Sequence, residues 1–126
     1  MKLLLDTHVL LWALAEPQKL PARVEAQLRN ADVAVYVSAV STWEIAIKTA
    51  LGKLRADLDE ILAAIGKVGF SELPVTIRHT AELRRLPHKH RDPFDRLLAA
   101  QALCEGLALV THDEVFQDYP VSIFWA

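Results

Sequence analysis

Four acidic side chains stand at positions in the chain where they could act together. Asp6 directly follows the first apolar run, and Asp113 follows a late apolar run, with two residues between them. Asp95 falls in the first turn of an apolar helical segment, and Glu44 lies about two turns into a helical segment that leaves another apolar run. Carboxylates that converge raise one another's pKa unless a cation compensates them. This pattern predicts a carboxylate cluster that binds a cation.

A hard, oxygen-binding cation such as Mg²⁺ or Mn²⁺ suits an all-carboxylate site. Zinc is disfavoured, because Cys104 is the only cysteine and the chain has no His-x-x-x-His pair. Carboxylate-bound metal ions favour phosphodiester hydrolysis, since they generate hydroxide near neutral pH and stabilise charge on the attacking and leaving oxygens. Such a site needs no separate protein nucleophile.

Each acid taken alone also has a purely structural interpretation. Asp6 and Asp113 could cap helices, and Asp95 could complete a capping pair with Asp92. However, Ser, Thr or Asn caps a helix equally well, so capping does not explain why ionisable acids recur after strands.

Glu44 is the most informative of the four acids. It could form a capping box with Ser41 or an ion pair with Lys48 one turn later. On a helical wheel it lies beside Leu51 at the edge of the apolar stripe, so we expect its side chain to be partly buried.

Predicted strands and helices, which must position these acids, alternate along the chain. Apolar runs predict strands at 3–5, 34–37, 69–74, 107–110 and 121–124. Helical spacing and cap signals predict helices at 9–16, 21–28, 38–51, 57–67, 77–86 and 93–105, with a short helix from 113. This order favours one α/β domain over residues 1–126 with a parallel sheet covered on both faces. Ligands bind such sheets beyond the carboxyl ends of the strands, where Asp6 and Asp113 are expected.

Composition narrows the class of protein. The 126 residues carry 16 acidic and 14 basic side chains, so the net charge of −2 excludes a polycation held to nucleic acid by bulk charge. A hydrophobic content of 52% excludes a disordered chain. The longest strictly apolar run, 9–15, is far shorter than the roughly 20 residues that span a bilayer. We therefore expect a soluble, cytoplasmic protein.

Four sequence blocks resemble the PIN-domain ribonucleases, and among them the VapC-type toxins of bacterial toxin-antitoxin pairs. They are Leu5-Asp6-Thr7-His8-Val9-Leu10-Leu11-Trp12, then Ser41 to Lys48 with Gly52-Lys53-Leu54, then His90 to Ala102, and finally Leu109-Val110-Thr111-His112-Asp113. Together they run nearly from end to end of the chain. A lone Asp-Thr pair would be a weak signal, but four blocks in this order and spacing are specific.

The resemblance implies a three-layer α/β/α domain with a five-stranded, mainly parallel sheet and a Mg²⁺-dependent endoribonuclease site. The family's acids fall on Asp6, Glu44, Asp95 and Asp113. Asp6 and Asp95 would be the main metal ligands, with Asp113 assisting and Glu44 a ligand or the base that positions water. Thr7 and Thr111 match the hydroxyl positions that orient the acids. Asp92, which precedes Pro93, is more simply a helix N-cap.

Basic side chains cluster beside Asp95. Five of the 14 lie within thirteen positions: Arg84, Arg85, Lys89, Arg91 and Arg96. They could contact RNA phosphates, or they could belong to a solvated loop. Lys48, Lys53 and Arg55 could form the opposite side of an RNA groove. As RNA contacts we select Lys48, Lys53, Arg91 and Arg96.

Aromatic residues and histidines also lie near the proposed acids. His8 and His112 each neighbour one of them, and a hydrogen bond that supports a metal ligand is the expected role. Trp12 and Trp43 fall on apolar helix faces, so we expect them in the core rather than as platforms for stacked bases.

These observations lead to the hypothesis of a metal-dependent endoribonuclease that cleaves structured RNA and is held inactive by a cognate antitoxin. The alternative is a catalytically silent PIN-like module that binds RNA or protein. A phosphatase of the Asp-x-Asp type is disfavoured, because position 8 is His8. The resemblance also implies a homodimer, for which apolar helix faces near Trp12 or the helix from Ile77 are candidates.

Overall fold

A five-stranded, fully parallel sheet forms the centre of the molecule. The computed structural model describes all residues, 1–126. The strands follow the spatial order β3-β2-β1-β4-β5. Their bounds are β1 Lys2–Leu5, β2 Ala34–Ser38, β3 Ser71–Leu73, β4 Ala108–Thr111 and β5 Ile123–Trp125. The prediction of an α/β fold with five strands is confirmed, and the sheet has no antiparallel strand.

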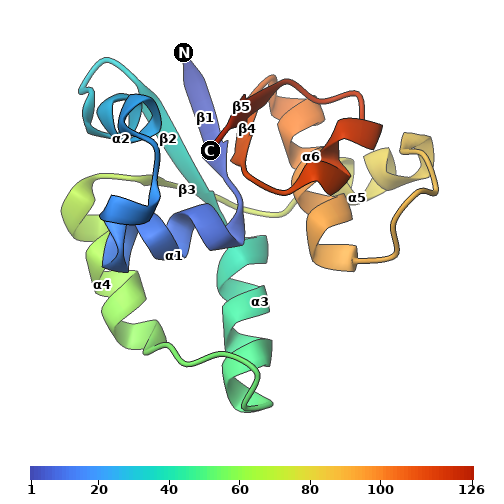
Figure 1. The fold of residues 1–126 in the computed structure, drawn as a ribbon. Helices are drawn as coiled ribbons and strands as arrows, with labels where there is room; N and C mark the ends of the chain where they lie inside the picture. The colour runs from blue at the N-terminus through green and yellow to red at the C-terminus, as the bar shows by residue number, and fades with distance from the viewer.

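Helices cover both faces of this sheet (Figure 1). The α-helices are α1 Thr7–Ala15, α2 Ala22–Arg29, α3 Ala39–Ala50, α4 Leu58–Val68, α5 Ile77–Glu82 and α6 Pro93–Glu105. Helices α1, α2 and α4 lie on one side and α5 and α6 on the other, while α3 extends away from the sheet beyond the carboxyl end of β2 (Figure 1). The three layers of the expected architecture are therefore present.

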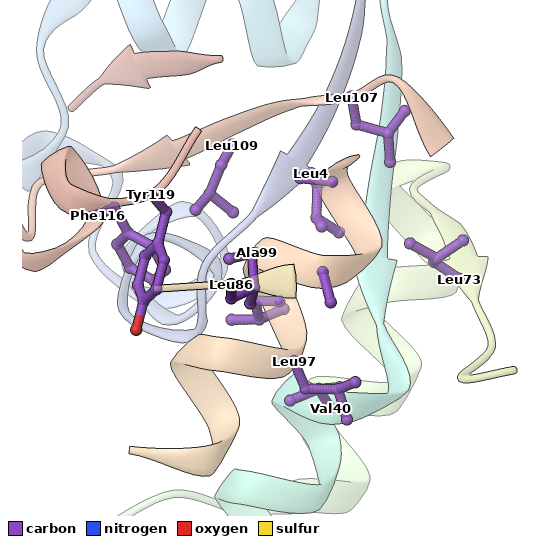
Figure 2. Packing of buried hydrophobic residues seen from close by; sticks show 13 residues of the cluster. Leu4, Val40, Leu73, Leu86, Leu97, Ala99, Leu107, Leu109, Phe116 and Tyr119 are labelled. Carbon is purple, nitrogen blue, oxygen red and sulfur yellow. The ribbon is translucent and has the colours of Figure 1, made fainter. Parts of the chain in front are cut away.

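Alternation along the strands divides the core into two clusters. In β1, Leu4 packs with Ala99 and other buried residues of α6 on one face. Leu3 and Leu5 point to the opposite face and pack with Val9 of α1. All three leucines of β1 have no exposed surface, as expected of a central parallel strand buried on both faces. Figure 2 shows the α6 side, with Leu4 directed toward Ala99.

Most predicted boundaries agree with the structure to within a few residues. The helix expected over 77–86 ends at Glu82 and continues as a 3₁₀ turn over Leu83–Arg85. A further 3₁₀ turn, Pro17–Lys19, was not predicted. The first helix starts at Thr7 rather than Val9, because Asp6 caps it from the end of β1. No helix of the chain is long and apolar enough to cross a membrane.

The carboxyl ends of the strands bring distant segments together. Leu5 in β1 pairs with Val37 in β2 and with Val110 in β4. The chain leaves these three strands into α1, α3 and the turn before Glu114. Residues just beyond positions 5, 37 and 110 therefore meet at one rim of the sheet.

Candidate active site

Asp6 is the most deeply buried of the four acids. Its side chain is 5% exposed. One carboxylate oxygen, Oδ1, accepts a hydrogen bond of 2.7 Å from the backbone N–H of Val9 and caps α1. The other oxygen, Oδ2, accepts a hydrogen bond from the hydroxyl of Thr111 at the end of β4. Burial raises the pKa of Asp6, although these two hydrogen bonds oppose the effect.

Glu44 reaches the same rim from α3. It is 8% exposed, which confirms the expected burial. The Thr7 hydroxyl donates to Glu44 Oε1 over 2.6 Å and lies 3.0 Å from the Ser41 hydroxyl. Glu44 Oε2 accepts a hydrogen bond from Lys48 Nζ at 2.5 Å. Thr7 therefore orients Glu44 from another helix, and the predicted pairing with Lys48 is present as well.

Asp92 and Asp95 have different roles at the start of α6: Asp92 caps the helix, and Asp95 lies in its first turn. Oδ1 of Asp92 accepts hydrogen bonds from the backbone N–H groups of Phe94 at 2.8 Å and Asp95 at 3.1 Å. Asp92 is thus the N-cap, as its place before Pro93 predicts. The Asp95 carboxylate accepts no hydrogen bond within the chain and remains available to a ligand.

Asp113 completes the group. Its Oδ1 accepts a hydrogen bond of 3.1 Å from the backbone N–H of Val115 and caps the 3₁₀ turn Glu114–Asp118. Its own backbone N–H donates to Thr111 Oγ1 over 3.0 Å. Thr111 therefore connects Asp6 and Asp113 through one hydroxyl.

The four acids interact electrostatically across the rim. Burial, followed by the negative charges of Asp92, Glu44, Asp113 and Asp6, raises the pKa of Asp95 to about 7. Carboxylates gathered in this way carry more negative charge than the neighbouring cations neutralise. Lys48 neutralises only part of it, and its own pKa is raised, chiefly by the hydrogen bond to Glu44.

The donor set fits a hard divalent cation, although the side chains are not arranged to hold one. The rim offers carboxylate and hydroxyl oxygens, the ligands of Mg²⁺ and Mn²⁺. No three of the chain's acidic, histidine or cysteine side chains lie in an arrangement that could hold a metal ion. Asp6 and Glu44 direct their oxygens to Thr111, Val9, Thr7 and Lys48 instead. Coordination by all four acids would require some of these side chains to turn.

The four predicted RNA contacts differ in whether they already have partners, and Lys48 is paired with Glu44. Arg96 donates hydrogen bonds to the backbone carbonyls of Pro87 at 2.7 Å and Leu83 at 3.3 Å, so it anchors the preceding loop to α6. These bonds engage two nitrogens of its guanidinium group, and the RNA contact of Arg96 stays a prediction. Arg91 and Lys53 are exposed and form no ion pair, which leaves both free for phosphate.

The two tryptophans differ in burial: Trp12 packs against a core cluster, as expected, whereas Trp43 does not follow the expectation. Trp43 was predicted in the core, but it is 47% exposed and packs edge-to-face on Phe94 with 4.7 Å between ring centroids. Trp12 is half-buried and packs against His112 at 4.6 Å and His8 at 5.8 Å. Neither histidine donates to an acid, so the expected supporting hydrogen bond is absent. An apolar helix stripe shows which residues are hydrophobic but not which neighbour covers them.

A pocket of about 530 Å³ between α1 and α4 was not predicted. His8 and Trp12 line it on the α1 side, so it begins close to the acids. Eight of its 13 lining residues are hydrophobic, and Glu16, Asp57 and Glu60 add acidic groups. No sequence signal marks this pocket, since its walls come from helices that are far apart along the chain.

Residues 3–121 match the family described as the PIN domain. The chain belongs to the PIN-domain family. This PIN domain is 32% identical over 133 residues to Ribonuclease VapC22 of Mycobacterium tuberculosis (strain ATCC 25618 / H37Rv), with 96% of this chain and 97% of the relative covered. The resemblance inferred from the four sequence blocks is thereby confirmed.

Solved structures of toxin-antitoxin complexes share the fold of this PIN domain. VapBC2 from Rickettsia felis, bound to a DNA fragment from its promoter, superposes with a TM-score of 0.73 and 16% identity over 99% of this chain and 98% of that chain. DNA-bound VapBC from Salmonella typhimurium gives a TM-score of 0.72 and 18% identity over the same shares of the two chains. At these identities the likeness establishes the fold alone.

Proposed function

We propose that this PIN domain is a ribonuclease toxin that hydrolyses phosphodiester bonds in structured RNA with the help of Mg²⁺ or Mn²⁺. The observation that carries the proposal is the gathering of Asp6, Glu44, Asp95 and Asp113 at one rim, where Thr111 and Thr7 hold Asp6 and Glu44. Burial and four neighbouring carboxylates raise the pKa of Asp95 to about 7. Repulsion within such a cluster destabilises the folded state unless a bound cation compensates it, so the cluster indicates a cation site. The 32% identity to a protein named as a ribonuclease supports the choice of reaction.

Asp6, Glu44, Asp95 and Asp113 would hold the cation. When bound, it supplies Lewis-acid stabilisation of the phosphodiester and activation of a water molecule. The chain contributes orientation: Thr111 fixes Asp6, and Thr7 fixes Glu44. Hydroxyl donors that hold ligating carboxylates in this way reduce the freedom that metal binding would otherwise remove.

RNA would be held beside the acids by exposed cations. Arg91 lies directly before the N-cap of α6, and Lys53 follows the end of α3. Arg91 precedes Asp95 by four residues, so a phosphate bound there would lie near the acids. Lys53 lies beyond the far end of α3 from Glu44, so it would bind a phosphate farther along the RNA. Arg96 stays a prediction outside this proposal, because two nitrogens of its guanidinium group already donate to backbone carbonyls.

A cognate antitoxin is the proposed inhibitor, and the apolar pocket between α1 and α4 is the surface it would cover. The mainly apolar lining favours an apolar helix, and Asp57 and Glu60 favour basic residues on it. Glu16 is already paired with Lys19, and Arg55 also lines the pocket. A partner seated there would also contact His8, next to the site acids. The solved neighbours described as VapBC complexes support this choice of partner. A homodimer through exposed apolar residues such as Ile77, which is 88% exposed, belongs to the same proposal.

The competing function is a silent module that binds RNA or protein without cleaving it. It is favoured by one observation, the absence of an arrangement that could hold a metal ion. The two functions differ in their response to added cations, because a silent module needs none.

Cleavage assays on small structured RNAs separate the two functions. Purified protein should cut RNA with Mg²⁺ or Mn²⁺, and EDTA should abolish the cutting. Asp6→Asn and Asp95→Asn should each lower the rate by more than the roughly 10- to 100-fold typical of residues that merely support metal ligands. Asp32→Asn, in an exposed loop, is the matched control. Cleavage that survives EDTA or both substitutions would contradict the proposal.

A further inference from the structure

The ion pair between Lys48 and Glu44 differs from the other ion pairs of the chain. It is the only one that includes a proposed site acid. The two residues are one helical turn apart on α3, so the helix itself brings them together. The Glu44 side chain is 10% exposed, whereas that of Lys48 is 40% exposed. The cation is thus at the mouth of the site and the acid is inside it.

Both oxygens of Glu44 already have partners. Thr7 donates to Oε1 and Lys48 donates to Oε2. The hydroxyl of Thr7 is neutral and leaves Oε1 with a free lone pair for a metal ion. The ammonium group of Lys48 is a positive charge, and a divalent cation at Glu44 would have to be placed beside it. A cation and Lys48 therefore compete for the same carboxylate.

Lys48 can leave without movement of the backbone. A lysine ammonium group is a compact charge on a flexible four-carbon stem, and this side chain is partly in solvent. The carboxylates of Asp92 and Asp95 also attract Lys48. A divalent cation held by the site acids would offset much of that negative charge, so the remaining anionic partner for Lys48 in the working complex would be a phosphate of the RNA backbone. Its place on α3, one turn from Glu44, keeps it within reach of a phosphate at the acids.

We propose that Lys48 exchanges partners: it neutralises Glu44 while no divalent cation is bound, and it contacts a phosphate of the RNA once a cation has taken its place at Glu44. The choice of cation and substrate in this inference rests on the proposed function. Lys48 is accordingly a positioning residue in the free protein and a substrate-binding residue in the complex.

Metal binding without RNA provides the first test. Mn²⁺ affinity of Lys48→Met, measured by electron paramagnetic resonance or calorimetry, should rise roughly fivefold over wild type, because one competing charge is removed. Lys48→Arg keeps the charge and should bind Mn²⁺ no more tightly than wild type. Arg29→Met breaks the matched i, i+4 pair with Glu25 on α2, away from the acids, and should leave the affinity unchanged. Equal affinities in wild type and Lys48→Met would overturn the exchange.

Thermal unfolding separates this exchange from an ordinary helix ion pair. In EDTA, Lys48→Met should melt below wild type, since buried Glu44 loses its only counter-ion. In saturating Mn²⁺ that difference should vanish, because the cation replaces Lys48. A difference of the same size in EDTA and in Mn²⁺ would mean that the pair is only structural.

Steady-state cleavage tests the second half of the exchange. Lys48→Met should raise KM for RNA, and the slope of log KM against log salt should fall by about 1, the change expected when one phosphate contact is lost. Arg29→Met should change neither quantity. An unchanged KM and slope would contradict the phosphate contact. If wild type cuts no RNA but Lys48→Met still binds Mn²⁺ more tightly, the proposed function fails while the competition at Glu44 stands.

Discussion

Thr111 Oγ1 donates a hydrogen bond to Asp6 Oδ2 and accepts one from the backbone N–H of Asp113. Thr111 has no exposed surface, and Asp6 has almost none. One hydroxyl thus links the ends of β1 and β4 and fixes an acid 105 residues away in the sequence. The position of Asp6 is therefore decided by a strand pairing as well as by its own helix cap.

Thr111→Val tests this link with a side chain of the same shape. Asp6 Oδ2 and the Asp113 N–H would lose a buried partner, so we expect a loss of about 1–3 kcal/mol in the free energy of unfolding. Mg²⁺ affinity should fall roughly 10- to 100-fold. Urea denaturation and metal titration measure the two effects. Thr111→Ser keeps the hydroxyl and should restore most of both; a Val variant with wild-type metal affinity would show that Thr111 does not position Asp6.

The raised pKa of Asp95 predicts how stability depends on pH. The carboxyl ionises at about 7 in the folded chain and near 3.8 when unfolded. Between these values the folded state holds a proton that the unfolded state has released, so stability falls as pH rises through this window. Asp6 shifts in the same direction and adds to the slope.

Urea denaturation in EDTA at pH 5 and pH 8 measures this slope. Asp95→Asn should lose less stability than wild type between the two pH values, and Asp32→Asn should behave like wild type. Added Mg²⁺ should restore wild type at pH 8 more than it restores Asp95→Asn. Parallel pH profiles for wild type and Asp95→Asn would mean that Asp95 titrates as it does in the unfolded chain.

Asp92 is predicted to act mainly through the cap of α6. Asp92→Ala removes the acceptor for the Phe94 and Asp95 N–H groups and should cost about 1 kcal/mol of stability. Asp92→Ser keeps a capping oxygen without the charge, so it should retain the stability and the rate of RNA cleavage. Chemical denaturation and cleavage assays test both. A large loss of activity in a stable Asp92→Ser variant would instead make Asp92 part of the site.

Gln101 is central to a buried polar network on the face of the sheet that α6 covers. Its amide accepts a hydrogen bond from the Ser38 hydroxyl and donates to the carbonyl of Pro74 at 3.2 Å. It also lies 3.3 Å from His79, which is 1% exposed. Gln101→Leu would leave at least two buried polar groups unpaired and should cost about 2–4 kcal/mol. Urea denaturation measures this loss, and Gln18→Leu, at an exposed position, should show none. An unchanged free energy of unfolding for Gln101→Leu would mean that water or neighbouring groups replace the amide.

Local sequence patterns determined the elements and the candidate acids. The leucines of β1 predicted a central strand because only a strand buried on both faces is apolar throughout. Asp92 before Pro93 predicted the start of α6, since both residues act within one helical turn. Asp6, Asp95 and Asp113 next to strand and helix ends, with Glu44 about two turns into α3, predicted a shared rim, because parallel strands all end on the same side of a sheet.

The partners of each acid came only from the tertiary structure. Glu44 had two candidate local partners in the sequence, and Thr7 of another helix was not one of them. Trp43 was assigned to the wrong surroundings, because a side chain's type does not reveal whether another element covers it. The carbonyls that accept hydrogen bonds from Arg96 were likewise not visible in the sequence. Spacing along a helix or strand fixes the direction of a side chain, but its neighbours depend on how distant elements pack.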